Sequence, residues 1–210
     1  MCSSDLGDFF DYFDLGRGRI GIALGDGTGK GLPAAMLVAE CGSVLSALVH
    51  EDHTPAELLH RMNTALYHRI GATGQFVTLF FLILDVDARR LYYSTAGHNP
   101  PLLAGAASGR MLRLESDLGF PLGIFDDSSF GEHQLTLEPD DTILIYSDGL
   151  TEAQAPDGSL YGEERLRIWL EQHRHLTAEA LLETLQTEVD HFQTGEQADD
   201  FTAVAVRIGG

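Results

Sequence analysis

Basic residues are scarce in this sequence. It has 13 Lys and Arg against 32 Asp and Glu, which gives a formal net charge of −19 over 210 residues. A surface this acidic repels nucleic-acid phosphates and anionic lipid headgroups, so we expect no nucleic-acid partner and no membrane contact through a basic patch. The hydrophobic content of 44% is ordinary for a chain that buries a core, which argues against intrinsic disorder.

Cysteines and long hydrophobic runs are also scarce. Cys2 and Cys41 cannot form a disulfide framework, and no Cys or His pair has zinc-ligand spacing. A reducing, cytoplasmic location fits this composition. The most apolar region, residues 31–50, is interrupted at Glu40 and is shorter than the ~18 residues of a membrane span. We therefore expect no membrane contact in this segment.

The first six residues differ from the rest of the chain. Residues 1–6 have neither the basic nor the apolar segment of a secretory signal, and they match the translation of a common sequencing-adapter end. We therefore expect a non-native leader at residues 1–6. The remaining residues, 7–210, have a length that a single domain with one core can fill.

Apolar patterns along the chain predict an α+β domain. Alternation and short apolar runs predict strands at residues 9–13, 19–24, 77–85, 90–95, 111–114, 130–137, 142–146 and 201–208. Apolar residues at helical spacing predict helices at residues 34–49, 55–70, 163–171 and 178–192. The helices come in two pairs between runs of strands, and the connections are short. This order is typical of antiparallel sheets rather than of alternating β-α-β units.

Two of the predicted helices have informative features. Thr54 and Glu57 have the spacing of a capping box, with Pro55 at the first helical position. The helix at residues 34–49 is small and apolar on all sides, which indicates burial between layers or at a subunit contact. A homodimer formed through this helix is therefore one candidate, and core packing is the simpler account.

Aspartates stand at the ends of the predicted strands. Asp26 and Asp148 each follow a strand, Asp199 precedes the last strand, and Asp8 begins the first. Asp26 is followed by Gly27, and Asp148 by Gly149. A glycine lets the backbone turn sharply and direct its carbonyl toward whatever the neighbouring carboxylate binds. Clustered carboxylates need a counter-charge, and a set of oxygen ligands favours Mg²⁺ or Mn²⁺. A single Asp-Gly pair is also explained by an ordinary turn.

Five motifs in chain order together resemble one known family. They begin at Gly7, Leu24, Ala96, Tyr146 and Ala198, with the sequences GDFFD, LGDGTGKGLPAA, AGHNPP, YSDGLTE and ADDFT. In this order they resemble the PP2C-like, metal-dependent protein phosphatases of the bacterial sporulation-phosphatase and sigma-regulator type. The resemblance covers essentially the whole chain.

The resemblance implies a fold and a metal site. The implied fold is a four-layer α/β/β/α sandwich, in which two antiparallel sheets are flanked by helix pairs. Asp26 is then expected to bridge two metals with help from the Gly27 carbonyl. Asp148 and Asp199 are expected to hold one metal, and Asp8 the other, directly or through water. Asp200 is a less certain neighbour of this site.

The resemblance also implies an activity. It implies hydrolysis of phosphoserine or phosphothreonine by a metal-activated water, so that Asp26, Asp148 and Asp199 act through the metal. The expected cofactors are two Mn²⁺ or Mg²⁺ ions, about 3.5–4 Å apart. The expected partner is a regulatory phosphoprotein, such as a phosphorylated anti-sigma-factor antagonist. An upstream sensory domain is expected in the intact protein.

The chain departs from the family pattern at three points. Thr28 stands where the animal-type branch has a histidine that is a candidate general acid, so the proton donor for the leaving group is unassigned. Leu6 stands where the first motif normally has a glycine. The strand that normally precedes this motif is missing, and we expect its absence to leave a sheet edge unpaired.

Several alternatives remain at this point. Lys30 is a weak candidate for contacting substrate phosphate, because loop lysines are mostly solvated. His98 is a candidate proton shuttle or ligand, although its sequence context is more typical of a structured turn. The main alternative function is a catalytically degenerate domain of the same fold that binds a phosphoprotein without hydrolysing it. An unrelated Ca²⁺-binding module is disfavoured because the sequence has no Asp-x-Asp-x-Asp-Gly loop.

Overall fold

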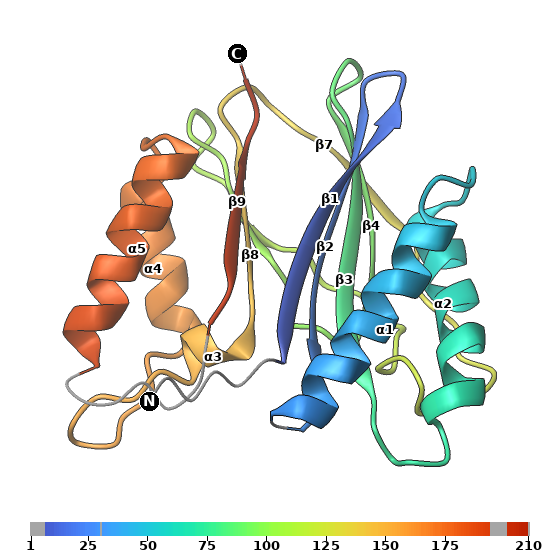
Figure 1. The fold of residues 1–210 in the computed structure, drawn as a ribbon. Helices are drawn as coiled ribbons and strands as arrows, with labels where there is room; N and C mark the ends of the chain where they lie inside the picture. Colours follow the sequence, from blue (N-terminus) through green and yellow to red (C-terminus); the bar gives the residue numbers. More distant parts are fainter. Residues whose placement is uncertain (1–6, 30, 194–200, 210) are drawn as a thin grey trace. The chain divides into compact units, whose positions relative to one another are not determined.

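The computed structural model describes residues 7–29, 31–193 and 201–209 (Figure 1). The chain divides into two compact units, residues 1–98 with 115–136 and residues 99–114 with 137–210. Each unit holds one antiparallel sheet and its own helices. Two antiparallel sheets with flanking helices confirm the predicted α+β class.

The sheet of the first unit has the strand order β1-β2-β3-β4-β7. Its strands are β1 (Asp8–Gly16), β2 (Arg19–Gly27), β3 (Val77–Asp85), β4 (Arg90–Ala96) and β7 (His133–Thr136). β1 and β2, two of the predicted strands, pair as an antiparallel hairpin. Arg17 in its turn has a φ of 54°, and the flanking Gly16 and Gly18 have φ values of 72° and 70°. Positive φ angles of this kind match the twist of paired strands in a tight hairpin.

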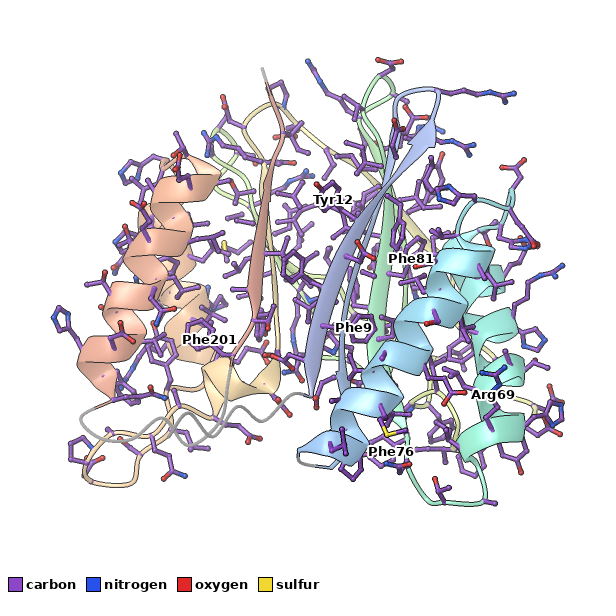
Figure 2. The ribbon with its side chains drawn as sticks, viewed as in Figure 1. Phe9, Tyr12, Arg69, Phe76, Phe81 and Phe201 are labelled. Carbon is purple, nitrogen blue, oxygen red and sulfur yellow. The ribbon has the colours of Figure 1, made fainter. Side chains whose placement is uncertain are left out.

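Helices α1 (Leu32–Leu48) and α2 (Pro55–Ile70) cover one face of this sheet (Figure 1). Their apolar residues share one core with Phe81 of β3, and the partly buried Phe9 of β1 packs against that core (Figure 2). At the surface, Arg69 of α2 forms an ion pair with Glu40 of α1, with an N···O distance of 2.7 Å. The two helices and the sheet therefore form one layered unit with its core between them.

The start of α2 confirms the predicted capping box. The Thr54 hydroxyl accepts from the Glu57 N–H at 3.3 Å, and the Glu57 carboxylate accepts from the Thr54 N–H at 3.0 Å. Pro55 occupies the first helical position, where its missing N–H has no partner to lose. The predicted apolar face is buried as well, and it comprises Leu58, Leu59, Met62, Leu66 and Ile70.

Helix α1 is buried along one face only. Its buried residues are Ala34, Leu37, Cys41 and Leu45, at helical spacing. On the other side, Leu32 and Met36 are 72% and 65% exposed. The prediction that this helix is buried between two layers is therefore wrong, because the small residues outside the buried stripe face solvent. The other predicted role, a subunit contact, stays a prediction.

The sheet of the second unit has the strand order β6-β5-β8-β9. Its strands are β5 (Leu102–Ala104), β6 (Met111–Arg113), β8 (Thr142–Tyr146) and β9 (Ala203–Arg207), and its helices are α3 (Asp148–Thr151), α4 (Glu163–His173) and α5 (Ala178–Phe192). Apolar residues of α4 and α5 pack against β5 and β8 in a separate core. The Arg207 guanidinium donates to the carbonyls of Arg174 and Leu176 at 3.0 and 2.8 Å, so β9 holds the end of α4.

The strand and helix bounds differ from prediction in a few places. β2 continues through Asp26 to Gly27, β7 is only four residues long, and the three-residue β5 and four-residue α3 were not predicted. Short elements of this kind carry too little periodicity to stand out in a sequence. Among the helices that the structure describes, none is long and apolar enough to cross a membrane.

Candidate functional site

Asp8 and Asp26 lie opposite each other at the open end of the β1–β2 hairpin. They are register partners in the antiparallel ladder, so their side chains are on the same face with Cβ atoms about 5 Å apart. The Gly27 N–H donates to the Gly7 carbonyl at 3.0 Å, which keeps the chains paired one step beyond the aspartates. Strand register therefore brings two predicted metal ligands together.

Gly7 makes room for the oxygen atoms of this site. A Cβ added at Gly7 would lie 2.6 Å from Oδ1 of Asp26 and 3.2 Å from the carbonyl oxygen of Gly27. Both oxygens therefore converge on the space beside the Gly7 Cα atom. A carboxylate and a main-chain carbonyl are hard ligands of the kind that Mg²⁺ and Mn²⁺ prefer, so these residues fit the expected cations.

Thr78 contacts Asp26 from the neighbouring strand, and His98 contacts Thr78. Thr78 is the β3 register partner of Asp26, and its hydroxyl lies 3.5 Å from the Asp26 carbonyl oxygen and 3.0 Å from Nδ1 of His98. The buried His98 is fixed in turn by hydrogen bonds between its backbone and the Thr95 hydroxyl. These bonds hold the backbone at His98, and the choice between a structured turn and a proton shuttle or ligand stays a prediction. Nothing in the sequence marks Thr78, because its role follows from the β2–β3 register.

Thr28 holds the loop after Asp26 in place. Its hydroxyl donates to the Phe76 carbonyl at 3.0 Å and accepts from the Phe76 N–H at 2.9 Å. The Thr28 N–H donates to the same carbonyl at 3.0 Å. Phe76 immediately precedes β3 at the same end of the sheet (Figure 2). The Thr28 side chain is thus engaged with backbone, which fits a structural role rather than the role of a proton donor.

Asp148 lies in the second unit, as the first residue of α3. Its side chain is exposed, and its carbonyl accepts from the Thr151 hydroxyl at 3.0 Å and the Glu152 N–H at 2.8 Å. The preceding Ser147 is buried and exchanges two hydrogen bonds with Thr202: Ser147 N–H to the Thr202 carbonyl at 3.0 Å, and Thr202 N–H to the Ser147 hydroxyl at 2.9 Å. The chain entering β9 is therefore tied to the start of α3.

The predicted site residues are only partly described. Asp8, Asp26 and Gly27 lie together in the first unit, and Asp148 belongs to the second. Asp199, Asp200, Lys30 and the predicted leader at residues 1–6 lie outside the described residues. Within the described ranges, no group of three or more His, Cys, Asp or Glu residues is placed to hold a metal ion. The part of the expected site that the first unit supplies is thus the pair of carboxylates on the hairpin with the Gly27 carbonyl.

Cys41 does not offer an alternative nucleophile. Burial, with a smaller contribution from the nearby Glu40 charge, raises the pKa of its thiol from 9.0 to about 12. A thiol with this pKa stays protonated near neutral pH, and the thiolate is the reactive form. Cys41 is therefore a small core residue.

A protein family and several curated bacterial proteins are similar to this chain over nearly its whole length. The model of the family "Stage II sporulation protein E (SpoIIE)" matches residues 16–209. The phosphoserine phosphatase RsbU of Bacillus subtilis (strain 168) is 27% identical over 201 residues, which cover 96% of this chain and 59% of RsbU. The phosphoserine phosphatase RsbP of the same organism is 25% identical over 202 residues, which cover 94% of this chain and 48% of RsbP. The chain thus spans about half the length of these relatives.

Solved structures show the same fold. The SiaA-PP2C domain of Pseudomonas aeruginosa has a TM-score of 0.84 at 20% identity, covering 96% of this chain and 80% of that domain. The RsbU and RsbW domains of Rv1364c from Mycobacterium tuberculosis give a TM-score of 0.79 at 24% identity, covering 100% of this chain and 58% of that structure. At these identities the likeness shows a PP2C-like fold. With the family model matching nearly the whole chain, the protein belongs to the SpoIIE family.

Proposed function

We propose that this chain is the catalytic domain of a metal-dependent protein phosphatase that hydrolyses phosphoserine or phosphothreonine. The observation that carries the proposal is the pairing of Asp8 with Asp26 beside the Gly27 carbonyl, in space left open by Gly7. In this proposal, Asp26 with the Gly27 carbonyl, Asp8, Asp148 and Asp199 would hold two Mg²⁺ or Mn²⁺ ions. Membership of the SpoIIE family supports this assignment.

The metals and the chain have separate tasks in this proposal. When bound, the divalent cations supply an activated water and neutralise charge on the phosphoryl group. The chain holds its carboxylates in fixed positions: strand register sets Asp8 against Asp26, and Thr78 lies against the Asp26 carbonyl. The overall reaction consumes one water and releases the hydroxyl side chain and inorganic phosphate. No protein nucleophile is needed.

We also propose the kind of substrate and its location. A phosphorylated regulatory protein, such as an anti-sigma-factor antagonist, is supported by the phosphoserine phosphatases RsbU and RsbP among the relatives. A cytoplasmic site of action is supported by the low cysteine content, with two cysteines in the chain.

The first prediction tests this activity. Purified protein is expected to hydrolyse p-nitrophenyl phosphate and a phosphoserine peptide with Mn²⁺ or Mg²⁺, and to stop in EDTA. Asp26→Asn is expected to reduce turnover to background, because it removes a negative charge that would hold the metals. Initial rates and Mn²⁺ titration by calorimetry measure both effects.

Asp14→Asn is the matched control. Asp14 lies on the same strand as Asp8, at the turn end, where it accepts from the Gly16 N–H at 2.8 Å. An amide oxygen still accepts that bond, so activity is expected to stay at the wild-type level. Wild-type protein that binds a phosphopeptide but never turns it over would instead favour the degenerate binding domain.

A further inference from the structure

The loop between β6 and β7 presents large apolar side chains to solvent. Leu118, Phe120, Ile124 and Phe125 are 56%, 59%, 36% and 50% exposed, and we call these four residues the apolar platform. The rings of Phe120 and Phe125 contact each other edge to face, with centroids 5.0 Å apart. A cluster of exposed apolar side chains on a soluble protein marks an interaction site.

The platform is built on a fixed backbone. Asn63 of α2 is fully buried, and its side-chain amide donates to the Phe125 and Asp126 carbonyls at 2.8 and 3.1 Å. Its carbonyl oxygen accepts from the Gly123 N–H at 2.9 Å. Three hydrogen bonds from one buried side chain hold the loop in a single shape. The anchored backbone therefore keeps the apolar side chains exposed. Because the loop is already ordered, a partner that binds there loses little free energy to ordering it.

The platform is also close to the candidate aspartates, within the same unit. Leu122, in the middle of the loop, exchanges two backbone hydrogen bonds with Val77, at 2.8 and 3.1 Å. Val77 is the register partner of Gly27, the neighbour of Asp26. Two strand spacings therefore separate the loop from the aspartate edge, which is about 10 Å.

The surroundings of the platform are acidic. Asp117, Asp126 and Asp127 are exposed on the same loop, on both sides of the apolar residues. An occupant that combines a large apolar side chain with adjacent basic residues complements this surface in both respects.

We propose that the apolar platform binds a large apolar side chain of the phosphoprotein substrate, in a segment that also carries Lys or Arg. Because an extended peptide rises about 3.3 Å per residue, this side chain lies about three residues from the phosphorylated one. The proposal rests on the proposed phosphatase function, since it places the phosphorylated residue at Asp8 and Asp26.

The second prediction tests the platform with peptides. The probe is a set of phosphoserine peptides with two arginines in a Gly-Ser background, in which a single leucine is moved through each position in turn. Leucine about three residues from the phosphoserine is expected to raise kcat/KM about tenfold, since partial burial of one leucine supplies about that factor. The double variant Phe120→Ser, Phe125→Ser is expected to lose this gain and to keep the wild-type rate on p-nitrophenyl phosphate.

Two control variants separate docking from general effects. Ile168→Ser removes an exposed apolar residue on α4 in the other unit and is expected to leave the leucine gain unchanged. Replacing both Asp126 and Asp127 by Lys is expected to remove the preference for arginine while keeping the preference for leucine. Thermal unfolding monitors the fold of each variant.

The outcomes distinguish this inference from the proposed function. If no leucine position raises kcat/KM, or if the double variant keeps the gain, the platform does not bind substrate. If the wild-type protein hydrolyses neither p-nitrophenyl phosphate nor peptide, the phosphatase proposal fails. In that case, amide chemical shifts on adding the leucine peptide still decide the platform: shifts at residues 118–125 support binding there, and their absence overturns it.

Discussion

The two units of this protein hold their candidate site residues in different ways. In the first unit, Asp8 and Asp26 are placed by the register of two long strands, and Gly7, Thr78 and Thr28 hold the surrounding backbone. In the second unit, Asp148 begins a four-residue helix, and its side chain is exposed. Its backbone is fixed through the neighbouring Ser147, which is tied to the start of β9.

The difference shows how the two halves of the proposed site, Asp8 with Asp26 and Asp148, would each be disturbed. A carboxylate held by strand register stays in place as long as the sheet is intact, so only a steric change beside it moves it. A carboxylate at the start of a short helix depends on the hydrogen bonds of its neighbours, because a single helical turn has little stability of its own. The first half is therefore sensitive to volume, and the second to lost hydrogen bonds.

Among substitutions that leave the candidate carboxylates themselves unchanged, the largest effect is expected from Gly7→Ala. The added Cβ would lie 2.6 Å from Oδ1 of Asp26, so the carboxylate must move by a fraction of an ångström to about 1 Å. A displacement of this size in a catalytic group lowers kcat/KM by about 100-fold. Metal-dependent hydrolysis measures the loss, and unfolding in urea is expected to show little change in stability.

Gly42→Ala is the control for that substitution. Gly42 lies in α1, and a Cβ added there meets no atom within 4 Å. The change is expected to stabilise the fold by about 0.5–1 kcal/mol, because alanine is the better helix former, and to leave turnover unchanged. Equal rates for Gly7→Ala and Gly42→Ala would contradict the steric account of the first half-site.

Much of the fold follows from local patterns that a sequence displays. The helix at Ala178–Phe192 and the strands at Val77–Asp85 and Thr142–Tyr146 have the predicted bounds, and the capping box of Thr54 starts α2 where expected. Each has either a long apolar period or a specific cap. The strand β5, three residues between Pro101 and Gly105, has neither feature. It is defined by its pairing with β6 on one edge and β8 on the other, which a sequence does not display.

The candidate site was predictable to a smaller extent. The motif around Asp26 marks that residue, and the hairpin turn at Gly16 and Gly18 sets the register that brings Asp8 opposite it. The supporting roles of Thr78 and Asn63 depend on contacts between segments 52 and about 60 residues apart in the chain. A single sequence displays residue types and spacings, and it does not display such long-range pairings.

An intermediate effect is expected from Ser147→Ala. The Thr202 N–H loses its hydroxyl acceptor in a buried setting, which costs about 1–3 kcal/mol of folding stability. Activity is expected to fall as well, because Asp148 follows Ser147 directly. Ser159→Ala is the control, since Ser159 is exposed in a turn and its hydroxyl donates to the neighbouring Asp157 carboxylate. If both substitutions cost the same, the tie between Ser147 and Thr202 does not hold this half of the site.

The smallest effects compare one helix cap from each unit. Thr54 takes part in two cap hydrogen bonds with Glu57. At the start of α5, the Thr177 hydroxyl accepts from the Ala180 N–H at 3.3 Å, and Ala180 has no carboxylate to return a bond. Thr54→Ala is expected to cost about 1–1.5 kcal/mol and Thr177→Ala about 0.5–1 kcal/mol. Ala180→Glu supplies a carboxylate at the matching position in α5 and is expected to recover a few tenths of a kcal/mol.

Urea unfolding followed by circular dichroism measures these costs, and the fluorescence of Trp169, the single tryptophan, reports the second unit separately. A cost for Thr177→Ala as large as that for Thr54→Ala would mean that the bond from the Thr54 N–H to the Glu57 carboxylate does not strengthen the cap bond that the Thr54 hydroxyl accepts.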